Sequence, residues 1–424
     1  MISVLDVYLH NRLIGKLTQD RVSLSFAYEE AYLKDKNAVP LSVSMPLTQS
    51  SFTGSIVASF FSGLLPDEQV RVRLGRYLGI SARNTFALLR EMGGDCSGAL
   101  SLFPEGVSPL SQNAHSFRVL SNTEAWDILS HLDKHPMLAG EEGIRMSGAG
   151  AQDKLMIAFV GNNIAIPTEN TPSTHIIKPQ IKGIEFSVQN EFFCMRLARK
   201  VGLSVPEARI FSLNGEVFYL VKRYDRRIEH DGRATRLHQE DFCQALYIAP
   251  EQKYENEGGP TLQMCFSLLD EKIKSGFMAG IHKVAFLRAV IFNYLIGNGD
   301  AHGKNFSLLY EGQAQSLAPL YDLMCTLVYG HSFKGKMAMK IGGKYAFHDV
   351  TLRHFDDLAQ QISLKSSFVR KEIQHMCQNI LPQAHALIGE IEHEGGSPCE
   401  IYDRIVSVIE KNVGRLKNLT LPPS

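Results

Sequence analysis

The sequence lacks the features that mark zinc-binding, secreted and membrane proteins. It has 7 cysteines but no Cys-x-x-Cys pair, and most of them lie within apolar runs, so we expect reduced core thiols and no structural zinc site. No apolar run is long enough to span a bilayer. The first residues, MISVLDVYLHNRLIG, are typical of a strand and a turn, not of a signal peptide. These absences predict a cytoplasmic protein with no membrane partner.

The sequence also lacks an excess of charge of either sign. Lys plus Arg and Asp plus Glu both number 44, so the formal net charge at pH 7 is zero. Proteins that coat nucleic acid nonspecifically or lie on a membrane surface usually carry a clear positive excess. The 424 residues, 44% of them hydrophobic, are sufficient for two or three ordinary globular domains.

The hydrophobic pattern changes along the chain. Strand hairpins are predicted around residues 10–12, 161–163 and 214–215, where polar or Gly-containing turns separate apolar pieces. Helical periodicity is interrupted at Pro66, and Ser121 with Glu124 resembles a capping box. After Gln239 the apolar residues mostly recur with the spacing of an α-helix. A strand-rich half followed by a helical half predicts an α+β fold with a cleft between the halves.

The segment SGAGAQDK, residues 147–154, combines small residues with a lysine just before a predicted strand. Gly148 and Gly150 permit backbone conformations that bring N–H groups close to an anion such as phosphate. The segment lacks the GK[ST] ending of a Walker A loop and the third glycine of GxGxxG. By itself it is more typical of an ordinary flexible turn than of a phosphate loop.

Lys178 ends the predicted buried strand HIIK, and Glu191 lies in the helix that follows. A buried lysine is unfavourable unless it is paired, and kinases use such a strand lysine with a helix glutamate to hold nucleotide phosphates. A snorkelling lysine and a solvated glutamate are the alternative.

The polar turn GDAHGKNF interrupts two apolar segments. Asp300 and Asn305 have the spacing of a kinase catalytic loop, in which the Asp accepts the substrate hydroxyl proton and the Asn binds a metal ion. Lys304 is suited to stabilise the charge of the transferring phosphoryl group, and Asp322, at an expected strand end, is a second metal ligand. A capped polar turn is the alternative, but the ordered series from residue 147 to residue 322 favours the kinase interpretation.

Several of these segments together resemble the HipA-type serine/threonine kinases, the toxins of bacterial toxin–antitoxin pairs. The similar segments extend over nearly the whole chain: LLPDEQVR, MGGDCSGALSLFPEG, SGAGAQDK, THIIKPQ, NEFFCMRLARKVGL, VKRYDRR, EDFCQAL, KYENEGGP, GNGDAHGKNFSLL, APLYDL and KMAMKIGGK. The resemblance implies a two-lobed, protein-kinase-like fold with a strand-rich N-terminal lobe and a mostly helical C-terminal lobe. It divides the chain into an N-terminal subdomain (1–105), the rest of the first lobe (106–235) and a helical lobe (236–424).

The resemblance also assigns roles to individual residues for an ATP- and Mg²⁺-dependent kinase. Asp300 is the catalytic base, assisted by Lys304, and Asn305 and Asp322 hold Mg²⁺. Glu191 is the structural ion-pair partner of Lys178. The implied ATP-binding residues are Ala149, Gly150, Ala151, Gln152, Asp153, Lys154 and Lys178 at the phosphates, Lys222, Arg223 and Tyr224 at the adenine, and His302, Gly303, Lys304, Asn305, Tyr321 and Asp322.

Ser147 matches the loop serine that such kinases autophosphorylate, which displaces the loop and inactivates them. Two features depart from the family pattern. Gly148 replaces a bulkier aliphatic residue, which indicates a looser loop, and the segment between Lys178 and Glu191, which helps to present the protein substrate in relatives, is short.

The resemblance implies partners as well. It implies a HipB-like helix-turn-helix antitoxin that binds operator DNA for the complex, and an aminoacyl-tRNA synthetase as the substrate whose phosphorylation arrests translation and promotes persistence. The neutral net charge agrees with a chain that leaves DNA reading mainly to its partner. Two alternatives remain: an inactive pseudokinase that acts as a binding module in operon regulation, and a small-molecule kinase with the same Asp–Asn layout.

Overall fold

The chain folds into two units that interleave along the sequence. This computed structural model describes residues 2–109, 116–230, 233–332 and 335–417. Unit 1 consists of Met1–Pro179, Phe211–Gln252 and Ser307–Gln315, and unit 2 consists of Gln180–Ile210, Lys253–Phe306 and Ser316–Ser424. The predicted subdivision at residues 105 and 235 stays a prediction; both positions fall within unit 1.

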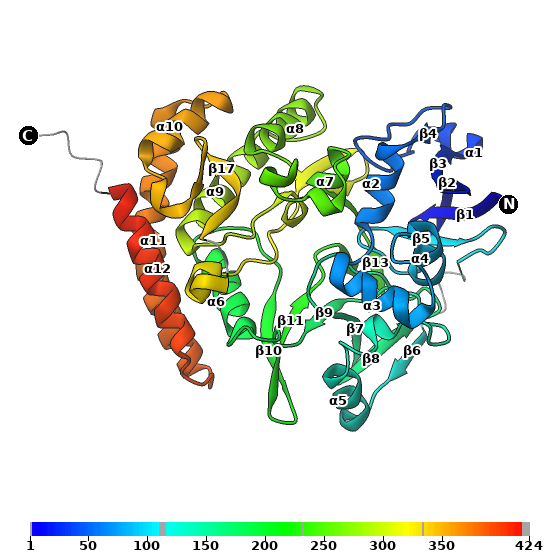
Figure 1. Ribbon diagram of the computed structural model, residues 1–424, viewed down its shortest axis with the longest axis horizontal. Helices are drawn as coiled ribbons and strands as arrows, with labels where there is room; N and C mark the ends of the chain where they lie inside the picture. The colour runs from blue at the N-terminus through cyan, green and yellow to red at the C-terminus, as the bar shows by residue number, and fades with distance from the viewer. Residues whose placement is uncertain (1, 110–115, 231–232, 333–334, 418–424) are drawn as a thin grey trace, which may run out of the picture. The chain divides into compact units, whose positions relative to one another are not determined.

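Unit 1 begins with an antiparallel sheet of five strands in the order β4-β3-β2-β1-β5 (Figure 1). The elements are β1 (Ile2–Leu9), β2 (Arg12–Asp20), β3 (Ser23–Tyr28), α1 (Glu30–Leu33), β4 (Phe52–Thr53), α2 (Ser55–Gly63), α3 (Glu68–Leu78), α4 (Thr85–Met92) and β5 (Leu100–Pro104). The predicted hairpin is confirmed: His10 and Asn11 have φ angles of 51° and 63°, as a type I′ turn requires. Pro66 separates α2 from α3, because proline cannot continue a helix.

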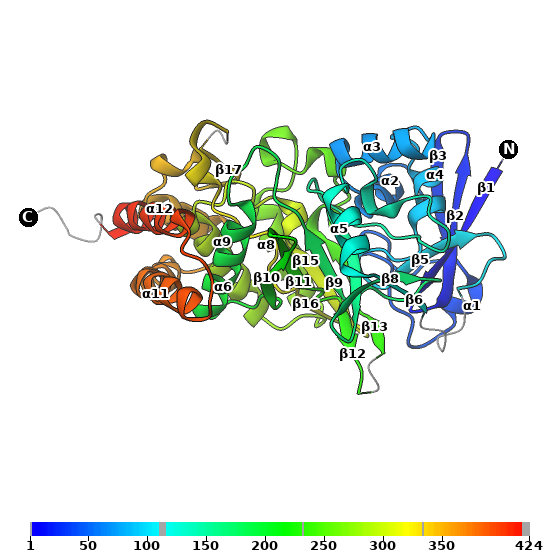
Figure 2. The ribbon, with the colours of Figure 1, turned by 90° about the horizontal axis from the view of Figure 1, so that it is seen from below.

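A second sheet has six strands in the order β10-β11-β9-β7-β8-β6 (Figure 1); it belongs to unit 1 except for the first three residues of β10. Figure 2 shows β10, β11, β9, β8 and β6 of this sheet from below. The elements are β6 (Ser116–Val119), α5 (Asn122–Ser130), the 3₁₀ helix η1 (Pro136–Leu138), β7 (Leu155–Val160), β8 (Asn163–Thr168), β9 (His175–Lys178), β10 (Ala208–Leu213) and β11 (Glu216–Lys222). The hairpins predicted near residues 162 and 214 and the capping box of Ser121 and Glu124 are confirmed. Side chains of α3 and α5 share one apolar core with this sheet.

The remaining elements of unit 1 come from later in the sequence. They are β12 (Arg226–Ile228), β13 (Ala234–Arg236), β14 (His238–Asp241), α7 (Phe242–Ala245), η2 (Pro250–Gln252), β15 (Ser307–Glu311) and β16 (Ala314–Leu317), whose last two residues belong to unit 2. Helices dominate after residue 239 as predicted, but five strands, β14 to β18, also occur in residues 236–424. The sequence analysis did not identify them, because each is short and β14 pairs with β15 across more than sixty residues.

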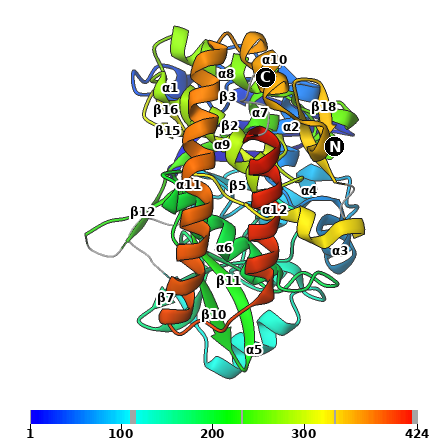
Figure 3. The ribbon, with the colours of Figure 1, turned by 90° about the vertical axis from the view of Figure 1, so that its left-hand side faces the viewer.

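Unit 2 is mostly helical. Its elements are α6 (Ser187–Lys200), η3 (Glu255–Glu257), α8 (Leu262–Lys274), α9 (Ile281–Ile296), η4 (Gly303–Asn305), η5 (Thr326–Ser332), β17 (Lys336–Ile341), β18 (Lys344–Ala346), η6 (Phe347–Asp349), α10 (Leu352–Gln361), α11 (Ser366–His393) and α12 (Glu400–Lys417). The long helices α11 and α12 lie side by side (Figure 3) and pack on α9 and α6, with Phe193 stacked on Tyr402 at 5.0 Å between ring centroids. No helix within the described residues is long and apolar enough to cross a membrane.

Candidate active site

The polar turn of unit 2 begins where α9 ends at Gly297. This residue has a φ of 70°, a left-handed conformation that glycine adopts without strain. A Cβ atom at this position would lie 2.8 Å from Val408 and 2.9 Å from Leu327, so the packing also requires glycine. Asn412 of α12 donates to the carbonyl oxygens of Tyr294 and Leu295 at 3.0 and 3.2 Å, which satisfies two acceptors at the helix end.

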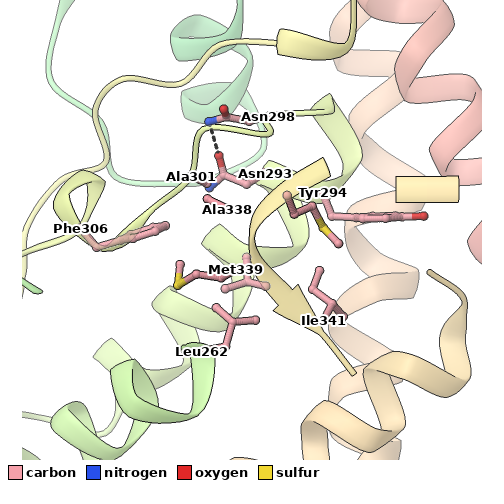
Figure 4. A pocket seen from close by; sticks show the side chains of 11 residues that line it. Leu262, Asn293, Tyr294, Asn298, Ala301, Phe306, Ala338, Met339 and Ile341 are labelled. Atoms are coloured by element: carbon pink, nitrogen blue, oxygen red, sulfur yellow. Dashed lines mark hydrogen bonds between the residues drawn. The ribbon is translucent and has the colours of Figure 1, made fainter. Parts of the chain in front are cut away.

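Neutral polar side chains then fix the backbone of the turn. Asn298 donates to Oδ1 of Asn293 at 2.7 Å and accepts from the backbone N–H of Asp300 at 3.0 Å (Figure 4). Thr326 accepts from the N–H of Gly299 at 2.8 Å and donates to the carbonyl of Gly297 at 3.1 Å. The direction in which Asp300 leaves the helix is therefore set by buried amides and a hydroxyl.

An apolar pocket lies beneath this turn and explains how the turn is supported. It is a cavity of about 30 Å³, lined by Leu262, Val290, Asn293, Tyr294, Asn298, Ala301, Phe306, Met337, Ala338, Met339 and Ile341 (Figure 4). Side chains of α8, α9 and β17 therefore face the same pocket as Ala301 and Phe306.

Asp300 and Asn305 lie together in this turn, as the sequence predicts. The Asp300 side chain is 44% exposed, whereas Asn305 is buried. The amide nitrogen of Asn305 donates to the backbone carbonyl of Asp300 at 2.8 Å, which fixes the orientation of the amide and leaves its carbonyl oxygen for another partner. His302 is buried, with Nε2 at 3.8 Å from Oδ1 of Asp300.

The other residues predicted on this side of the site are also near the turn. Gly303 and Lys304 are buried in η4, and Tyr321 donates from its hydroxyl to the Lys304 carbonyl at 2.7 Å. Asp322 corrects one expectation, because it does not end a strand: β16 stops at Leu317. It lies in the following non-strand segment with a φ of 53°, and its carbonyl accepts from Asn298 at 3.5 Å.

In unit 1, Ser147 is buried at the start of the predicted phosphate loop, with 1% exposure. Its hydroxyl donates to the carbonyl of Leu64 at 2.7 Å. Its backbone N–H donates to the carbonyl of Asp95 at 3.0 Å. The serine is therefore enclosed in this conformation, and a kinase could reach its hydroxyl only after the loop moved outward.

Within the loop, Lys154 turns back over the backbone. Its ammonium donates to the carbonyl of Ala149. Gly150 has a φ of 107°, and a Cβ atom at this residue would lie only 2.5 Å from the Lys154 ammonium nitrogen. Ala151 is exposed, and Gln152 donates to the Pro179 carbonyl at 3.0 Å. These positions leave the Lys154 ammonium in the bend of the loop, where a phosphate could bind.

Asp153, also predicted to bind ATP, contacts a cation of the protein. Its carboxylate forms two hydrogen bonds with Arg73, at 2.6 and 3.1 Å. A carboxylate that already pairs with an arginine, and that would repel phosphate, is better suited to hold the loop than to bind nucleotide.

Lys178 is the last residue of β9 and is 5% exposed. Its ammonium lies 5.3 Å from the centroid of the Tyr219 ring, its cross-strand neighbour on β11, and this contact favours the cation. Glu191 is 2% exposed in α6. The predicted pair stays a prediction, because Lys178 belongs to unit 1 and Glu191 to unit 2.

The three residues predicted to contact adenine differ in exposure and in their hydrogen-bond partners. Lys222 is exposed at the end of β11, and the Tyr224 hydroxyl donates to Oε1 of Gln239. The Arg223 guanidinium is buried and bonds to Asp225, Asp95 and Ser173. Its side chain is thus turned into the protein, so only its backbone remains as a candidate to contact adenine.

Arg223 belongs to a buried ion cluster that the sequence analysis did not identify. The cluster contains two carboxylates and three guanidinium groups: Asp95, Asp225, Arg223, Arg226 and Arg236. Burial by itself would raise the pKa of Asp95, but Arg226, Arg223 and Arg236 outweigh burial and hold this pKa well below its usual range. Burial, together with Arg223, lowers the pKa of Arg226 to about 10.

The cluster connects segments far apart in sequence. Asp95 accepts from Arg226 at 2.8 Å, from Nε of Arg236 at 3.1 Å and from the Ser173 hydroxyl at 2.6 Å. The same residue holds the backbone of Ser147 through its own carbonyl. The only signal in the sequence was the charge-rich segment VKRYDRR, whose acidic partner 130 residues earlier is not indicated by any local pattern.

Comparison with known families agrees with this arrangement. Residues 146–384 match the HipA-like C-terminal domain, and residues 5–103 match the HipA N-terminal domain. The chain belongs to the HipA family. The C-terminal match contains the phosphate loop, Lys178 and the turn from Gly297 to Asn305, and the family resemblance inferred from the sequence is confirmed.

Individual HipA relatives are similar over most of the chain. A candidate kinase called Y4mE from Sinorhizobium fredii is 41% identical over 379 residues, which cover 88% of this chain and 89% of the relative. The serine/threonine-protein kinase toxin HipA of Shewanella oneidensis is 32% identical over 356 residues, covering 80% and 79%. Among solved structures, the complex of HipA, HipB and operator DNA from Shewanella oneidensis MR-1 includes a chain with a TM-score of 0.83, 26% identity and coverage of 98% and 97%.

Proposed function

We propose that the protein is an ATP- and Mg²⁺-dependent serine/threonine protein kinase that acts as the toxin of a toxin–antitoxin pair. The observation that carries the proposal is the turn from Asp300 to Asn305. It presents a partly exposed carboxylate beside a buried amide whose nitrogen is occupied by a backbone carbonyl. This combination supplies a proton acceptor and an oxygen ligand within six residues, as kinase-type phosphoryl transfer requires.

In the proposed reaction, the Asp300 carboxylate accepts the proton of a serine or threonine hydroxyl of the substrate. The hydroxyl oxygen forms a bond to the γ-phosphorus of ATP as the bond from that phosphorus to the β–γ bridging oxygen breaks, and ADP leaves. Lys304 supplies positive charge close to the base. The neutral anchors Asn298 and Thr326 hold Asp300 in place, so little reorganisation is needed during the proton transfer.

The donor set of this turn fits a hard divalent cation. The carbonyl oxygen of Asn305 and the carboxylate of Asp322 are the two protein ligands we assign to it. Mg²⁺ is commonly bound by one or two such groups together with water and substrate phosphates. When bound, the ion neutralises charge on the phosphates.

The nucleotide phosphates are assigned to residues of unit 1. The Lys154 ammonium lies in the bend of the loop at Gly150, and Lys178 is a buried cation at a strand end. Both are suited to phosphate oxygens, and the absence of a side chain at Gly150 leaves the backbone accessible. Asp153 and the Arg223 side chain, which are bonded internally, hold the loop and the connecting segment in place.

Ser147 is proposed as the self-inactivation switch. Phosphorylation would add roughly two negative charges to a residue that is 1% exposed and bonded to the Leu64 carbonyl. A phosphoserine cannot donate that hydrogen bond, and its burial next to a carbonyl oxygen is unfavourable. The modified loop should therefore remain outside its present position and lose ATP affinity.

The proposed antitoxin follows from a solved relative, and the proposed substrate follows from the resemblance of the sequence to the HipA family. The solved Shewanella oneidensis complex contains HipA, HipB and operator DNA, and we propose a corresponding DNA-binding antitoxin for this chain. The proposed substrate is an aminoacyl-tRNA synthetase, whose phosphorylation would arrest translation and promote persistence.

The test is to incubate the purified chain with ATP labelled at the γ-phosphate, Mg²⁺ and total cell protein from which this chain is absent. We expect label on one or few proteins and on the Ser147 peptide, and neither with Asp300→Asn. ATP binding without any transfer would indicate a pseudokinase. Label found only on small molecules would indicate a small-molecule kinase, and either result contradicts the proposal.

The Ser147 switch needs its own measurement. Intact-mass analysis and peptide mapping after incubation with ATP and Mg²⁺ should locate one phosphate on Ser147 in the wild type and none in Ser147→Ala. A wild type that phosphorylates its target but gains no phosphate at Ser147 would overturn the switch and leave the kinase assignment intact.

A further inference from the structure

A tyrosine outside the predicted site contacts the proposed catalytic base. The hydroxyl of Tyr254 donates a hydrogen bond to Oδ1 of Asp300. Both residues belong to unit 2, but 46 positions separate them in the sequence. Tyr254 lies in the segment KYENEGGP, to which neither the motif spacing nor the nucleotide site gives a role.

The position of the tyrosine is fixed by more than this one hydrogen bond. Its ring packs edge-on against His302, with 5.1 Å between ring centroids and an interplanar angle of 86°. Its carbonyl accepts from the N–H groups of Glu257 and Gly259, both at 2.9 Å. Gly258, with a φ of 94°, allows the tight turn that these two bonds form.

A second element holds this turn from the other side. The carboxylate of Glu255 accepts from the backbone N–H of Lys340 in β17 at 2.7 Å and lies 3.4 Å from the Lys340 ammonium. Strand β17 is also the strand that lines the pocket beneath the turn of Asp300. The segment of Tyr254 and the turn of Asp300 therefore both lie next to strand β17.

We propose that Tyr254 is a positioning residue for Asp300. A carboxylate has two oxygen atoms, and the Tyr254 hydroxyl engages one of them. It thereby restricts rotation of the side chain and leaves the second oxygen to accept the proton of the substrate hydroxyl. The inference rests on the proposed kinase function, since it concerns the base of that reaction.

The alternative is that Tyr254 only packs against His302. The substitution Tyr254→Phe separates the two, because it retains the ring and removes the hydroxyl. Tyr402→Phe is the matched control, since it removes a buried hydroxyl from α12 of the same unit. Transfer of labelled phosphate from ATP to total cell protein is measured as a rate at saturating ATP and as the ATP concentration that gives half of that rate.

For Tyr254→Phe we expect a roughly tenfold lower rate at saturating ATP, the size of one lost hydrogen bond to a charged group. The half-saturating ATP concentration and the melting temperature should stay at wild-type values. In the background of Asp300→Asn, the same substitution should have no further effect, because the hydroxyl acts through the carboxylate. Tyr402→Phe should transfer phosphate at the wild-type rate.

Three results would overturn the inference while the kinase function stands. These are an unchanged rate for Tyr254→Phe, an equal loss with and without Asp300→Asn, and a loss that appears only in ATP affinity or melting temperature. A higher rate would also overturn it, since the hydroxyl would then block the base. A wild type that binds ATP but transfers no phosphate contradicts the proposed function itself, and the positioning role with it.

Discussion

The Ser147 loop of unit 1 and the Asp300 turn of unit 2 are anchored by different chemistry. The turn at Asp300 is held by neutral groups: the amides of Asn298 and Asn412 and the hydroxyl of Thr326. The loop that begins at Ser147 rests on the backbone of Asp95, whose side chain lies in a cluster of three arginines and a second aspartate. Neutral anchors do not depend on pH, whereas a buried ion cluster does.

This difference agrees with the tasks we propose for the loops. A proton acceptor must keep one geometry through every turnover, and buried, fully bonded amides provide that. A loop that carries a regulatory serine must be able to leave its position. In the present position of the loop, Ser147 bonds to the carbonyls of Leu64 and Asp95. Breaking these bonds would release the loop, and its interior glycines permit the backbone rotation that an outward position requires. Four substitutions test the contrast.

The largest effect is expected at the base itself. Asp300→Asn keeps the size of the side chain but removes the proton acceptor, so the rate of phosphoryl transfer should fall by about 10²–10⁴. ATP affinity and the melting temperature should change little. Asp403→Asn, at an exposed position of α12, is the control and should be fully active. Near wild-type transfer by Asp300→Asn would mean that Asp300 is not the base.

The next largest effect is expected from breaking the ion cluster. Asp95→Asn would leave three buried arginines with one carboxylate, and removing one partner from a buried pair typically destabilises by about 3–5 kcal/mol. Trp126, the one tryptophan of the chain, lies in α5 of unit 1, so its fluorescence during urea denaturation reports on this unit. Asp127→Asn, whose side chain is 79% exposed, serves as control.

Asp95→Asn also tests how the stability of the protein depends on pH. The pKa of Asp95 is lowered in the folded state, so its contribution to stability is present above its usual value of 3.8 and is lost as the pH falls below it. The wild type should therefore lose more stability than Asp95→Asn on acidification through this range. If the free energy of unfolding fell equally with pH in the wild type and in Asp95→Asn, the ion cluster would not be the source of acid sensitivity.

A smaller effect is expected at a neutral anchor. Asn412→Ala removes the side-chain donor to the carbonyls of Tyr294 and Leu295. The Tyr294 carbonyl keeps the backbone N–H of Gly297 at 3.1 Å, so the main loss is at Leu295, and an unsatisfied buried group costs about 1–3 kcal/mol. We expect a lower urea midpoint for the helical signal in circular dichroism and a lower transfer rate, with an unchanged Trp126 transition. Asn379→Ala removes only an exposed bond to the preceding turn of α11 and should not differ from wild type. If Asn412→Ala shifted only the Trp126 transition, Asn412 would not be an anchor of the Asp300 turn.

An effect on stability of similar size, joined by a change in ATP affinity, is expected in the proposed phosphate loop. Gly150→Ala places a side chain at a φ of 107° and against the Lys154 ammonium, so strain of about 1–3 kcal/mol should be accompanied by weaker ATP binding. Gly161→Ala has the strain of a left-handed residue at a φ of 60° but contacts nothing, and should bind ATP normally. Equal ATP affinity in both variants would exclude a role for the ammonium in phosphate binding.

Local features of the fold were predictable from the sequence because their causes are local. The turns at residues 10–11, 161–162 and 214–215 need residues that tolerate positive φ, and such residues occur there. Ser121 and Glu124 form their capping box within a single helical turn. The end of α9 at Gly297 and the proximity of Asp300 and Asn305 follow from short sequence separations.

Strand pairing and charge pairing were not predictable in the same way. Strand β14 is four residues long, and its partner β15 begins more than sixty residues later. Asp95 lies in a glycine-rich segment of the sequence. Its arginine partners follow about 130 residues later, so no local pattern indicates the pairing. Asp322 was expected at a strand end and lies five residues beyond the end of β16.

The sequence by itself thus determined the family, the α+β class, the hairpins and helix ends, and the set of polar residues from Ser147 to Asp322 that bears the proposed chemistry. Each of these depends on residue type and on spacing within a few turns of chain. Only the tertiary structure decided that Arg223 points into an ion cluster, that Ser147 is enclosed, and that the Tyr254 hydroxyl engages Asp300. These contacts join segments brought together by packing of the core, and no local pattern encodes which distant segments will meet.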